Sequence, residues 1–271
     1  MLAKLPDNIV PLKVLFIGDI VGELGREAVR QLLPDLKSKH QADLVIANAE
    51  NVSHGNGLTK KHYFDLVTSL GIDFLTGGNH IWDKKDIFKD IRSFTKLVRP
   101  ANFPPGVPGL EKLIVEVKGL KIGIFNLLGR VFMQSYDDPF RAADRMVDEL
   151  RKDDVDITLV DIHAEATSEK VALGWYLDGR VSAIIGTHTH VQTADEKILP
   201  KGTAYITDVG FTGGSNSVIG VEIAPVLRRF QTQISAKFDP PSTGPMQFNA
   251  VVVEIGDDGK AINIERILER I

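Results

Sequence analysis

The chain has 271 residues, of which 43% are hydrophobic and 25% are charged, and its formal net charge is −4. This is the composition of a globular protein with material for a large core, and the negative charge argues against a general attraction to long nucleic acid. The chain contains no cysteine, which excludes disulfides, thiolate metal ligands and a thiol nucleophile.

The sequence carries no predicted membrane anchor or export signal. Asp7, Asn8 and two prolines interrupt the apolar residues near the start, and no small-residue cleavage site follows. No apolar run approaches the roughly 20 residues that a membrane-spanning helix needs. We therefore expect a cytoplasmic protein that has no membrane partner.

Strand-like and helix-like segments alternate through the first half of the chain. Short apolar runs that end in polar residues predict strands, and amphipathic stretches between them predict helices. The predicted strands are 12–19, 43–51 and 72–80, and the predicted helices are 27–40, with an irregularity at Pro34, 60–70 and 83–94. This alternation is typical of β-α-β units.

The second half follows a loop rich in proline and glycine at 102–109 and adds hairpins to the pattern. Paired apolar runs around Lys118–Gly119 and Asp257–Gly259 predict two β-hairpins. Further strands are predicted at 156–167, 181–190 and 204–210, and a helix at 139–152. We predict an α/β protein.

Metal-capable side chains follow five of the predicted strands. They are Asp19, the pair Glu50–Asn51, the pair Asn79–His80, His163, and the pair His188 and His190. In open α/β sheets ligands bind beyond the carboxyl ends of the strands, so these residues predict one common site. Residues two apart in an extended segment point to the same side, so His188 and His190 are expected to face one point.

The candidate site determines our prediction for the domains. Its residues come from both sides of the loop at 102–109, which could otherwise divide the chain into two halves. We therefore predict one domain over residues 1–271, in which residues 1–11 form a short N-terminal extension.

The types of side chain narrow the choice of metal. Carboxylate, amide oxygen and imidazole together suit Fe, Mn, Zn or Co better than Ca, which favours oxygen ligands only. Seven candidate ligands exceed the four that one zinc ion usually takes, and with one bridging carboxylate they would suit two ions. Two neighbouring ions can activate a water and stabilise an in-line phosphoryl displacement.

Six segments together resemble one known family. They are GDIVG (18–22), NAEN (48–51), GGNHIWD (77–83), NLLGRVFM (126–133), DIHAEAT (161–167) and GTHTHVQT (186–193). Each segment alone is modest, but in this order they resemble the YmdB-type family of calcineurin-like metallophosphoesterases over nearly the whole chain. The resemblance implies an αββα sandwich, in which two facing mixed sheets are flanked by helices.

The resemblance also implies an activity and a role for each matching residue. The implied enzyme is a phosphodiesterase that uses two metal ions, Fe or Mn before Zn, on small phosphoesters such as cyclic nucleotides, 2′,3′-cyclic ones included. Asp19, Asn51 and His190 would bind one ion. Asn79, His163 and His188 would bind the other, and Glu50 would bridge the two. His80 would lie beside the substrate and protonate the leaving oxygen.

The sequence departs from the wider superfamily at two places. The first motif there is Asp-x-His, whereas Ile20 and Val21 follow Asp19 here, and Asn51 takes the place of the missing ligand. The family commonly has proline and aspartate where this chain has Gly214 and Asn216. The segment 211–220 therefore indicates no substrate.

Two other functions compete with this interpretation. Capsule or polyglutamate-synthesis enzymes of the CapA type have similar Asn-His and His-x-His motifs, although they usually accompany membrane attachment. A non-catalytic regulator could hold the same metals for structure alone. The partner expected in the first interpretation is a small phosphoester, with no long nucleic acid, and a homo-oligomer is compatible with it.

Several further polar residues have two open interpretations. Asp161, Glu165 and Asp208 either orient the ligating histidines or belong to the charged surface. Arg130 contacts either a phosphate or a structural carboxylate. Asp19 would only cap the following helix if it bound no metal. His62, within a predicted helix, is expected to be solvated.

Overall fold

Apolar residues on both faces of the central strands determine a layered architecture. The computed structural model describes residues 11–271, so most of the predicted N-terminal extension lies outside the described residues. In β1 (Leu12–Ile17), Val14 and Phe16 pack in one buried cluster while Leu15 and Ile17 pack in another. A strand buried on both faces reads as a continuous apolar run, as this one does.

The first sheet has eight strands and contains both ends of the described chain. The strand order is β2–β12–β13–β1–β3–β4–β5, and β14 also pairs with β13. Besides β1, its strands are β2 (Asp19–Ile20), β3 (Leu44–Asn48), β4 (Phe74–Thr76), β5 (Leu97–Val98), β12 (Phe211–Gly214), β13 (Met246–Ile255) and β14 (Ala261–Arg270). β1, β3, β4 and β5 run parallel, whereas β13 is antiparallel to β1 and β14.

The second sheet has six strands in the order β10–β11–β9–β8–β7–β6. Its strands are β6 (Lys112–Val117), β7 (Leu120–Leu128), β8 (Ile157–His163), β9 (Ala183–Thr187), β10 (Lys197–Ile198) and β11 (Ala204–Ile206). The predicted hairpins are confirmed, since β6 pairs antiparallel with β7 and β13 with β14. β7, β8, β9 and β11 are parallel.

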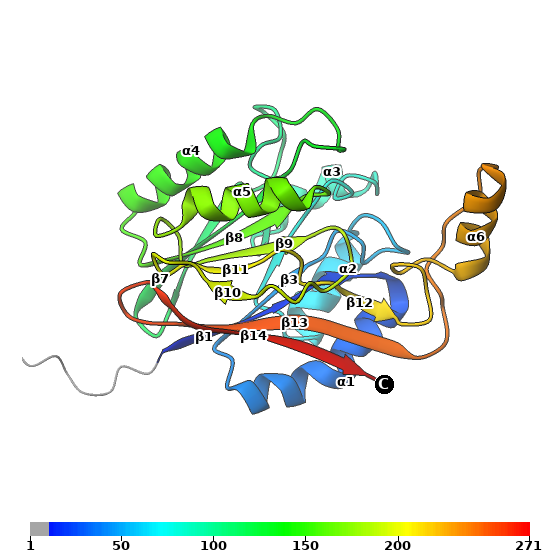
Figure 1. Cartoon of the computed structure of the whole chain (residues 1–271), viewed down its shortest axis with the longest axis horizontal. Coiled ribbons are helices and arrows are strands. Elements are labelled where there is room, and N and C mark those ends of the chain that lie inside the picture. The colour runs from blue at the N-terminus through cyan, green and yellow to red at the C-terminus, as the bar shows by residue number, and fades with distance from the viewer. Residues whose placement is uncertain (1–10) are drawn as a thin grey trace, which may run out of the picture.

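The two sheets face each other and helices cover their outer faces (Figure 1). Phe16 of the first sheet and Ile124 and Leu159 of the second share the buried cluster between them. α1 (Gly22–His40) packs against the outside of the first sheet, and α4 (Pro139–Lys152) and α5 (Thr167–Leu177) pack against the outside of the second. The predicted αββα sandwich is therefore confirmed.

The helices differ from the predictions in length more than in place. α1 begins five residues before the predicted helix and continues through Pro34. The predicted helix at 83–94 is one short turn, α3 (Ile87–Asp90), followed by a 3-10 turn over Ile91–Ser93. α4 begins as expected at Pro139, because the Asp138 carboxylate accepts the Phe140 N–H at 2.8 Å.

Two further helices complete the described chain. α2 (Lys60–Phe64) passes into a π-helical turn at Asp65–Ser69, and α6 (Ile223–Thr232) stands away from both sheets in Figure 1. Within residues 11–271, no helix combines the length and the apolar character that crossing a membrane requires.

A buried ion pair joins α5 to the segment after β11 and reaches the loop after β9 through hydrogen bonds. Lys170 and Asp208 are both fully buried, and the Lys170 Nζ lies 2.7 Å from an Asp208 carboxylate oxygen. The same oxygen accepts the Thr189 N–H at 3.0 Å, while Nζ also donates to the Thr187 carbonyl at 2.7 Å. The pair therefore fixes the backbone on which His188 and His190 lie.

We expect Lys170→Met to lower the free energy of unfolding by about 3–5 kcal/mol, because it leaves a buried carboxylate without its cation. Urea denaturation measures this loss. The double variant Lys170→Met, Asp208→Asn should recover part of it. The control is Lys60→Met, which breaks the exposed pair with Asp90 and should cost no more than about 1 kcal/mol. Equal losses in Lys170→Met and the control would contradict the role of the buried pair.

His62 is not solvated as predicted but holds the loop before α2. Its Nδ1 lies 2.6 Å from the Ser53 hydroxyl and 3.0 Å from that of Thr59, which also caps the helix. Both hydroxyls can donate to Nδ1 only while the ring is neutral. Burial, with the charge of nearby Arg26, lowers the pKa of His62 to about 4.

Acid should therefore weaken this contact in a defined pH range. The pKa of His62 is about 4 in the folded chain and 6.5 for a free imidazole, so the unfolded chain binds the proton more readily between these values. The stability that His62 contributes is present above pH 6.5 and is lost as the pH falls towards 4. Denaturation curves of the wild type and His62→Gln should therefore converge over this range, and a constant difference would contradict the assignment.

Candidate metal centre

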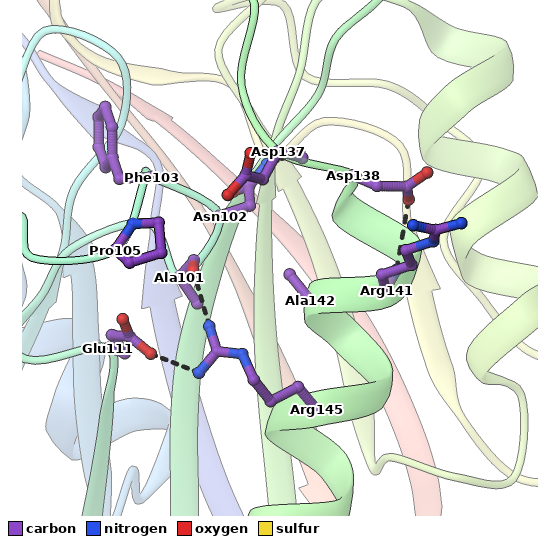
Figure 2. A pocket seen from close by; sticks show the side chains of 10 residues that line it. All are labelled: Ala101, Asn102, Phe103, Pro105, Glu111, Asp137, Asp138, Arg141, Ala142 and Arg145. Carbon is purple, nitrogen blue, oxygen red and sulfur yellow. Dashed lines mark hydrogen bonds and ion pairs between the residues drawn. The ribbon is translucent and has the colours of Figure 1, made fainter.

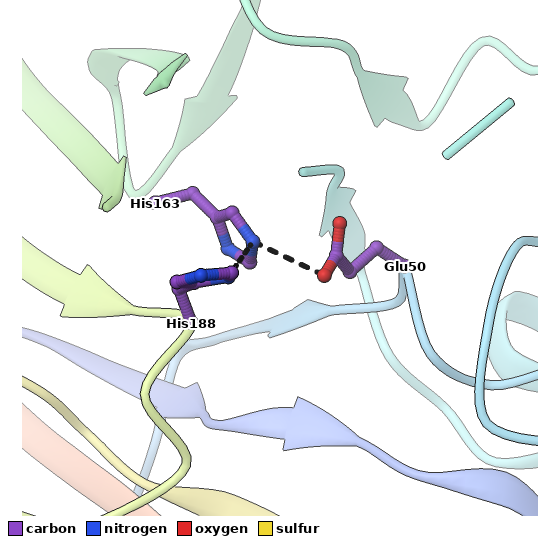
Figure 3. A group of neighbouring side chains, drawn as sticks. All are labelled: Glu50, His163 and His188. Carbon is purple, nitrogen blue, oxygen red and sulfur yellow. Dashed lines mark hydrogen bonds and ion pairs between the residues drawn. The ribbon is translucent and has the colours of Figure 1, made fainter. Parts of the chain in front are cut away.

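Three predicted ligands meet where the two sheets converge at the ends of their parallel strands. Glu50 follows β3, His163 ends β8, and His188 follows β9 (Figure 3). The Glu50 Oε1 lies 3.1 Å from the His163 Nε2, and the His188 Nδ1 lies 3.0 Å from the same nitrogen. One ligand atom from each residue falls within 4.8 Å of the others, so the three could hold one ion.

A fourth predicted ligand joins this group. The Asn79 side-chain oxygen lies 3.0 Å from the His163 Nε2. Asn79 follows β4, so both sheets contribute to the cluster. The amide oxygen, two imidazoles and carboxylate all direct potential ligand atoms to the same small volume.

Asp19 and His190 lie together beside this group. The Asp19 Oδ1 is 3.7 Å from the His190 Nε2 and 3.9 Å from the His163 ring, which connects it to the first group. This oxygen is buried and has no hydrogen-bond partner among the described residues, and the same holds for the side-chain oxygen of Asn51. Buried acceptors without a donor are costly, and a cation would satisfy both.

Neighbouring charges and hydrogen bonds together shift the pKa values of Asp19, His163 and His190 more than burial does. Burial alone would raise the pKa of Asp19, but His190, His163 and the N–H of His188 hold it well below its usual range. Burial opposes a proton on His163 and on His190, yet Glu50 raises the pKa of His163, and Asp19 raises that of His190 to about 9. The two carboxylates therefore draw positive charge to the site.

His188 and His190 converge by a different geometry from the one predicted. β9 ends at Thr187, and the two histidines lie in the following loop with φ of 95° and 63°. The prediction from an extended segment was therefore wrong in its mechanism. Positive φ is rare for residues with a side chain, and here Asp208 and Asp19 hold the loop through the N–H groups of Thr189 and His188.

Hydrogen bonds behind the histidines fix which ring nitrogen faces the site. The His163 Nδ1 lies 2.9 Å from the Thr187 hydroxyl, which donates to Asp161 at 2.7 Å. The His190 Nδ1 donates to the Ile219 carbonyl at 2.8 Å. The His163 Nε2 therefore faces Glu50 and the His190 Nε2 faces Asp19, so each ring directs Nε2 to one carboxylate and is held through Nδ1.

The structure also shows what the polar residues with two open interpretations contact. Asp161 acts on His163 through Thr187, and burial raises the pKa of Asp161 to about 6. Glu165 contacts the His188 Nε2 at 3.2 Å. Asp208 holds the loop backbone and not a ring. Arg130 forms an exposed ion pair with Asp138 at 3.1 Å.

His80 lies at the rim of the cluster. Its backbone N–H donates to the Glu50 Oε2 at 2.8 Å, while its ring is 41% exposed and its Nδ1 lies 2.8 Å from an Asp83 carboxylate oxygen. Asp83 thus orients the ring and leaves Nε2 available. The backbone supports Glu50, and the ring can serve a molecule that enters from solvent.

Gly78 is a site residue that sequence reasoning missed. A Cβ at this position would lie 2.1 Å from the Glu50 Oε2 and 2.7 Å from the His163 Nε2. Only glycine therefore lets the loop after β4 pass this close to the carboxylate. The pair Gly77–Gly78 directly before Asn79 was the available signal in the sequence.

Asp19 does not act as a helix cap. The N-cap of α1 is Val21, which makes no side-chain capping bond, and Asp19 pairs through its backbone in β2 with Phe211. The capping alternative is therefore wrong.

A separate hollow of about 540 Å³ lies at the start of α4 and contains no candidate metal ligand (Figure 2). Arg145 reaches into it but is occupied, since its guanidinium contacts Glu111 and donates to the Ala101 carbonyl at 2.9 Å. The hollow therefore offers no free Arg145 for a phosphate.

Comparisons with known proteins agree over almost the whole chain. Residues 15–267 match the model of a family described as YmdB-like protein. The 2′,3′-cyclic-nucleotide 2′-phosphodiesterase of Bacillus subtilis (strain 168) is 50% identical over 258 residues, which are 95% of this chain and 97% of that protein.

Two solved structures share the fold closely. A hypothetical protein from Thermus thermophilus has a TM-score of 0.89 and 44% identity, covering 96% of this chain and 99% of that one. A novel phosphatase from Mycoplasma pneumoniae has a TM-score of 0.89 and 39% identity, covering 97% and 95%. With six motifs in order and a family match from residue 15 to residue 267, the chain belongs to the YmdB-like family of metallophosphoesterases.

Proposed function

We propose that this chain is a metal-dependent phosphodiesterase that hydrolyses small cyclic nucleotides, 2′,3′-cyclic ones included. The observation that carries the proposal is the cluster of carboxylate, amide and imidazole groups with two buried oxygens that lack donors. The Bacillus subtilis relative that is 50% identical to this chain is named as a 2′,3′-cyclic-nucleotide 2′-phosphodiesterase, which supports the proposed substrate class.

The proposed ligand sets divide the seven residues between two ions. Asp19, Asn51 and His190 would hold one ion. Asn79, His163 and His188 would hold the second, and Glu50 would bridge the two. Two ions held in this way would lower the pKa of a shared water and neutralise charge on the phosphate. Fe or Mn, before Zn, suits this mixture of oxygen and nitrogen ligands.

His80 is the proposed general acid. Asp83 holds its Nδ1 at 2.8 Å, so the ring presents Nε2 to a substrate at the rim of the cluster. A proton delivered from Nε2 would neutralise the departing ribose oxygen, which is a poor leaving group without it.

Two further proposals concern the whole protein. The chain acts in the cytoplasm, and it acts as one domain, which is supported by site residues from both sides of the loop at 102–109. A homo-oligomer is compatible with this function, and light scattering in solution tests it.

A regulator that uses its metals only for structure is the second candidate. Phosphodiesterase assays of metal-loaded wild type and of Asn79→Ala distinguish the two, because a regulator would show no turnover that depends on Asn79. The CapA-type alternative is not supported by the family match over residues 15–267.

We expect wild-type protein purified without chelator to contain about two ions per chain, and Glu50→Gln to lose metal and turnover together. The substitution keeps the shape of the side chain but removes a charge that both ions share. Elemental analysis and an assay on the same samples measure this. Glu23→Gln, the same change at an exposed position in α1, is the control. Full occupancy and rate in Glu50→Gln would show that Glu50 is not the bridge.

We expect His80→Ala to keep its metals while turnover of a 2′,3′-cyclic nucleotide falls by about 10²–10⁴, the contribution of a general acid. Bis(4-nitrophenyl) phosphate should lose less, because its leaving group departs without a proton. Steady-state kinetics on both substrates, with metal content measured in parallel, provide the comparison. An equal loss on both would make His80 a residue that positions phosphate, and a loss of metal would make it a ligand.

A further inference from the structure

A second pocket opens directly beside the candidate metal centre. It has a volume of about 250 Å³ and is lined by Asn79, His188 and four residues of one loop, Phe132, Met133, Gln134 and Tyr136. Asn79 and His188 belong to the proposed ligand set, so a phosphate held there would have this pocket at its side. The loop includes the end of the motif NLLGRVFM, for which the proposed reaction provides no role.

The loop is held firmly at both ends. The Glu169 carboxylate, in the first turn of α5, accepts the N–H groups of Arg130 and Val131 at 3.0 and 3.2 Å. The Asn102 amide joins the two ends, because it donates to the carbonyl of Leu128 at the end of β7 at 2.8 Å and to that of Asp137 before α4 at 2.9 Å. The residues between these points are therefore presented by a fixed frame.

Phe132 is the unusual residue in this frame. Its side chain is 89% exposed, more than any other large apolar side chain in residues 11–271, and its backbone has a φ of 61°. An exposed phenyl ring loses the favourable free energy of burying an apolar side chain. Positive φ adds backbone strain at a residue that has a Cβ. Neither feature benefits the free protein, which points to a contact with a ligand.

The rest of the pocket suits a flat polar ring. Tyr136 is half-buried and packs edge-to-face on Phe103, with ring centres 5.4 Å apart, so it forms a fixed wall. It donates to the Gln134 side-chain oxygen at 3.2 Å, which fixes that amide and turns its NH₂ group into the available donor. An aromatic face beside amide donors is what a nucleobase requires.

We propose that this pocket binds the base of the substrate nucleotide, with Phe132 as the stacking platform and Gln134 at the base edge. The inference rests on the proposed function, since it places the base beside a phosphate at the metal centre. Every base has a π-face that can stack on Phe132, and a single side-chain amide distinguishes poorly between bases. The pocket therefore accepts purines and pyrimidines. It selects nucleotides over cyclic phosphates that lack a base.

The test compares a substrate with and without its base. Adenosine 2′,3′-cyclic phosphate and methyl ribofuranoside 2′,3′-cyclic phosphate have the same reacting group. We expect Phe132→Ala to raise KM for the first by about 5- to 150-fold, which corresponds to base–aromatic stacking of ~1–3 kcal/mol, with kcat unchanged. The second substrate should be unaffected, and Phe132→Tyr should behave as the wild type. Phe230→Ala removes an exposed ring from α6, outside this pocket, and is the matched control.

A binding measurement makes the result independent of turnover. In saturation-transfer NMR with adenosine 3′-monophosphate, the base protons should receive the strongest transfer from the wild type and lose it in Phe132→Ala. Metal content and the melting temperature should not change, because the ring contacts mainly solvent.

The possible failures are distinguishable. If Phe132→Ala affects both cyclic phosphates equally, or neither, the base pocket is wrong while the phosphodiesterase function stands. If the wild type hydrolyses neither substrate, the proposed function fails, and the NMR measurement still decides whether Phe132 contacts a base.

Discussion

Buried negative charge at the ends of the central strands is the constraint on which the rest of this structure depends. Asp19 and Glu50 are both buried, and one Asp19 oxygen has no donor among the described residues. A buried carboxylate is stable only beside positive charge or donors. Glu50 raises the pKa of His163 and Asp19 raises that of His190, so the two carboxylates favour protons on these rings. The same arrangement suits metal ions, which would replace those protons.

The surrounding fold can be understood as support for that concentration of charge. Gly78 lets a backbone segment approach Glu50 where any side chain would collide with it. The Lys170–Asp208 pair holds the loop of His188 and His190 in a conformation with positive φ. Such strain persists only where several contacts determine it together, and here a buried ion pair and backbone hydrogen bonds do so. A rigid frame also spares the protein reorganisation during the reaction.

The candidate metal ligands lie at the ends of strands, whereas the proposed base pocket lies on a loop. The candidate ligands follow strands of both sheets, which fixes their spacing to the core. The proposed base pocket lies on a loop between β7 and α4, held at its ends by Glu169 and Asn102. The residues at the tip of such a loop can vary without disturbing the core, so one metal centre can serve substrates with different groups beside the phosphate.

The sequence by itself determined the α/β class and the predicted site residues. Apolar runs that end in Asp19, Glu50 or His163 indicate strands with a site beyond their carboxyl ends, because strand periodicity and strand polarity are local properties. The resemblance to a family then implied the two-sheet sandwich and divided the residues between two ions, which spacing alone could not do. The helix predicted at 83–94 was too long, because packing against the sheet and not the local apolar pattern decides where this helix ends.

Only the tertiary structure decided how these residues meet. His188 and His190 converge through positive φ, and Asp19 meets His190 from a distant part of the sequence. The roles of Gly78, Lys170 and His62 likewise depend on neighbours that are remote in sequence or on a loop conformation. Periodicity records which face of an element is buried, but close approach, charge pairing and backbone strain arise between elements, and no local pattern contains them.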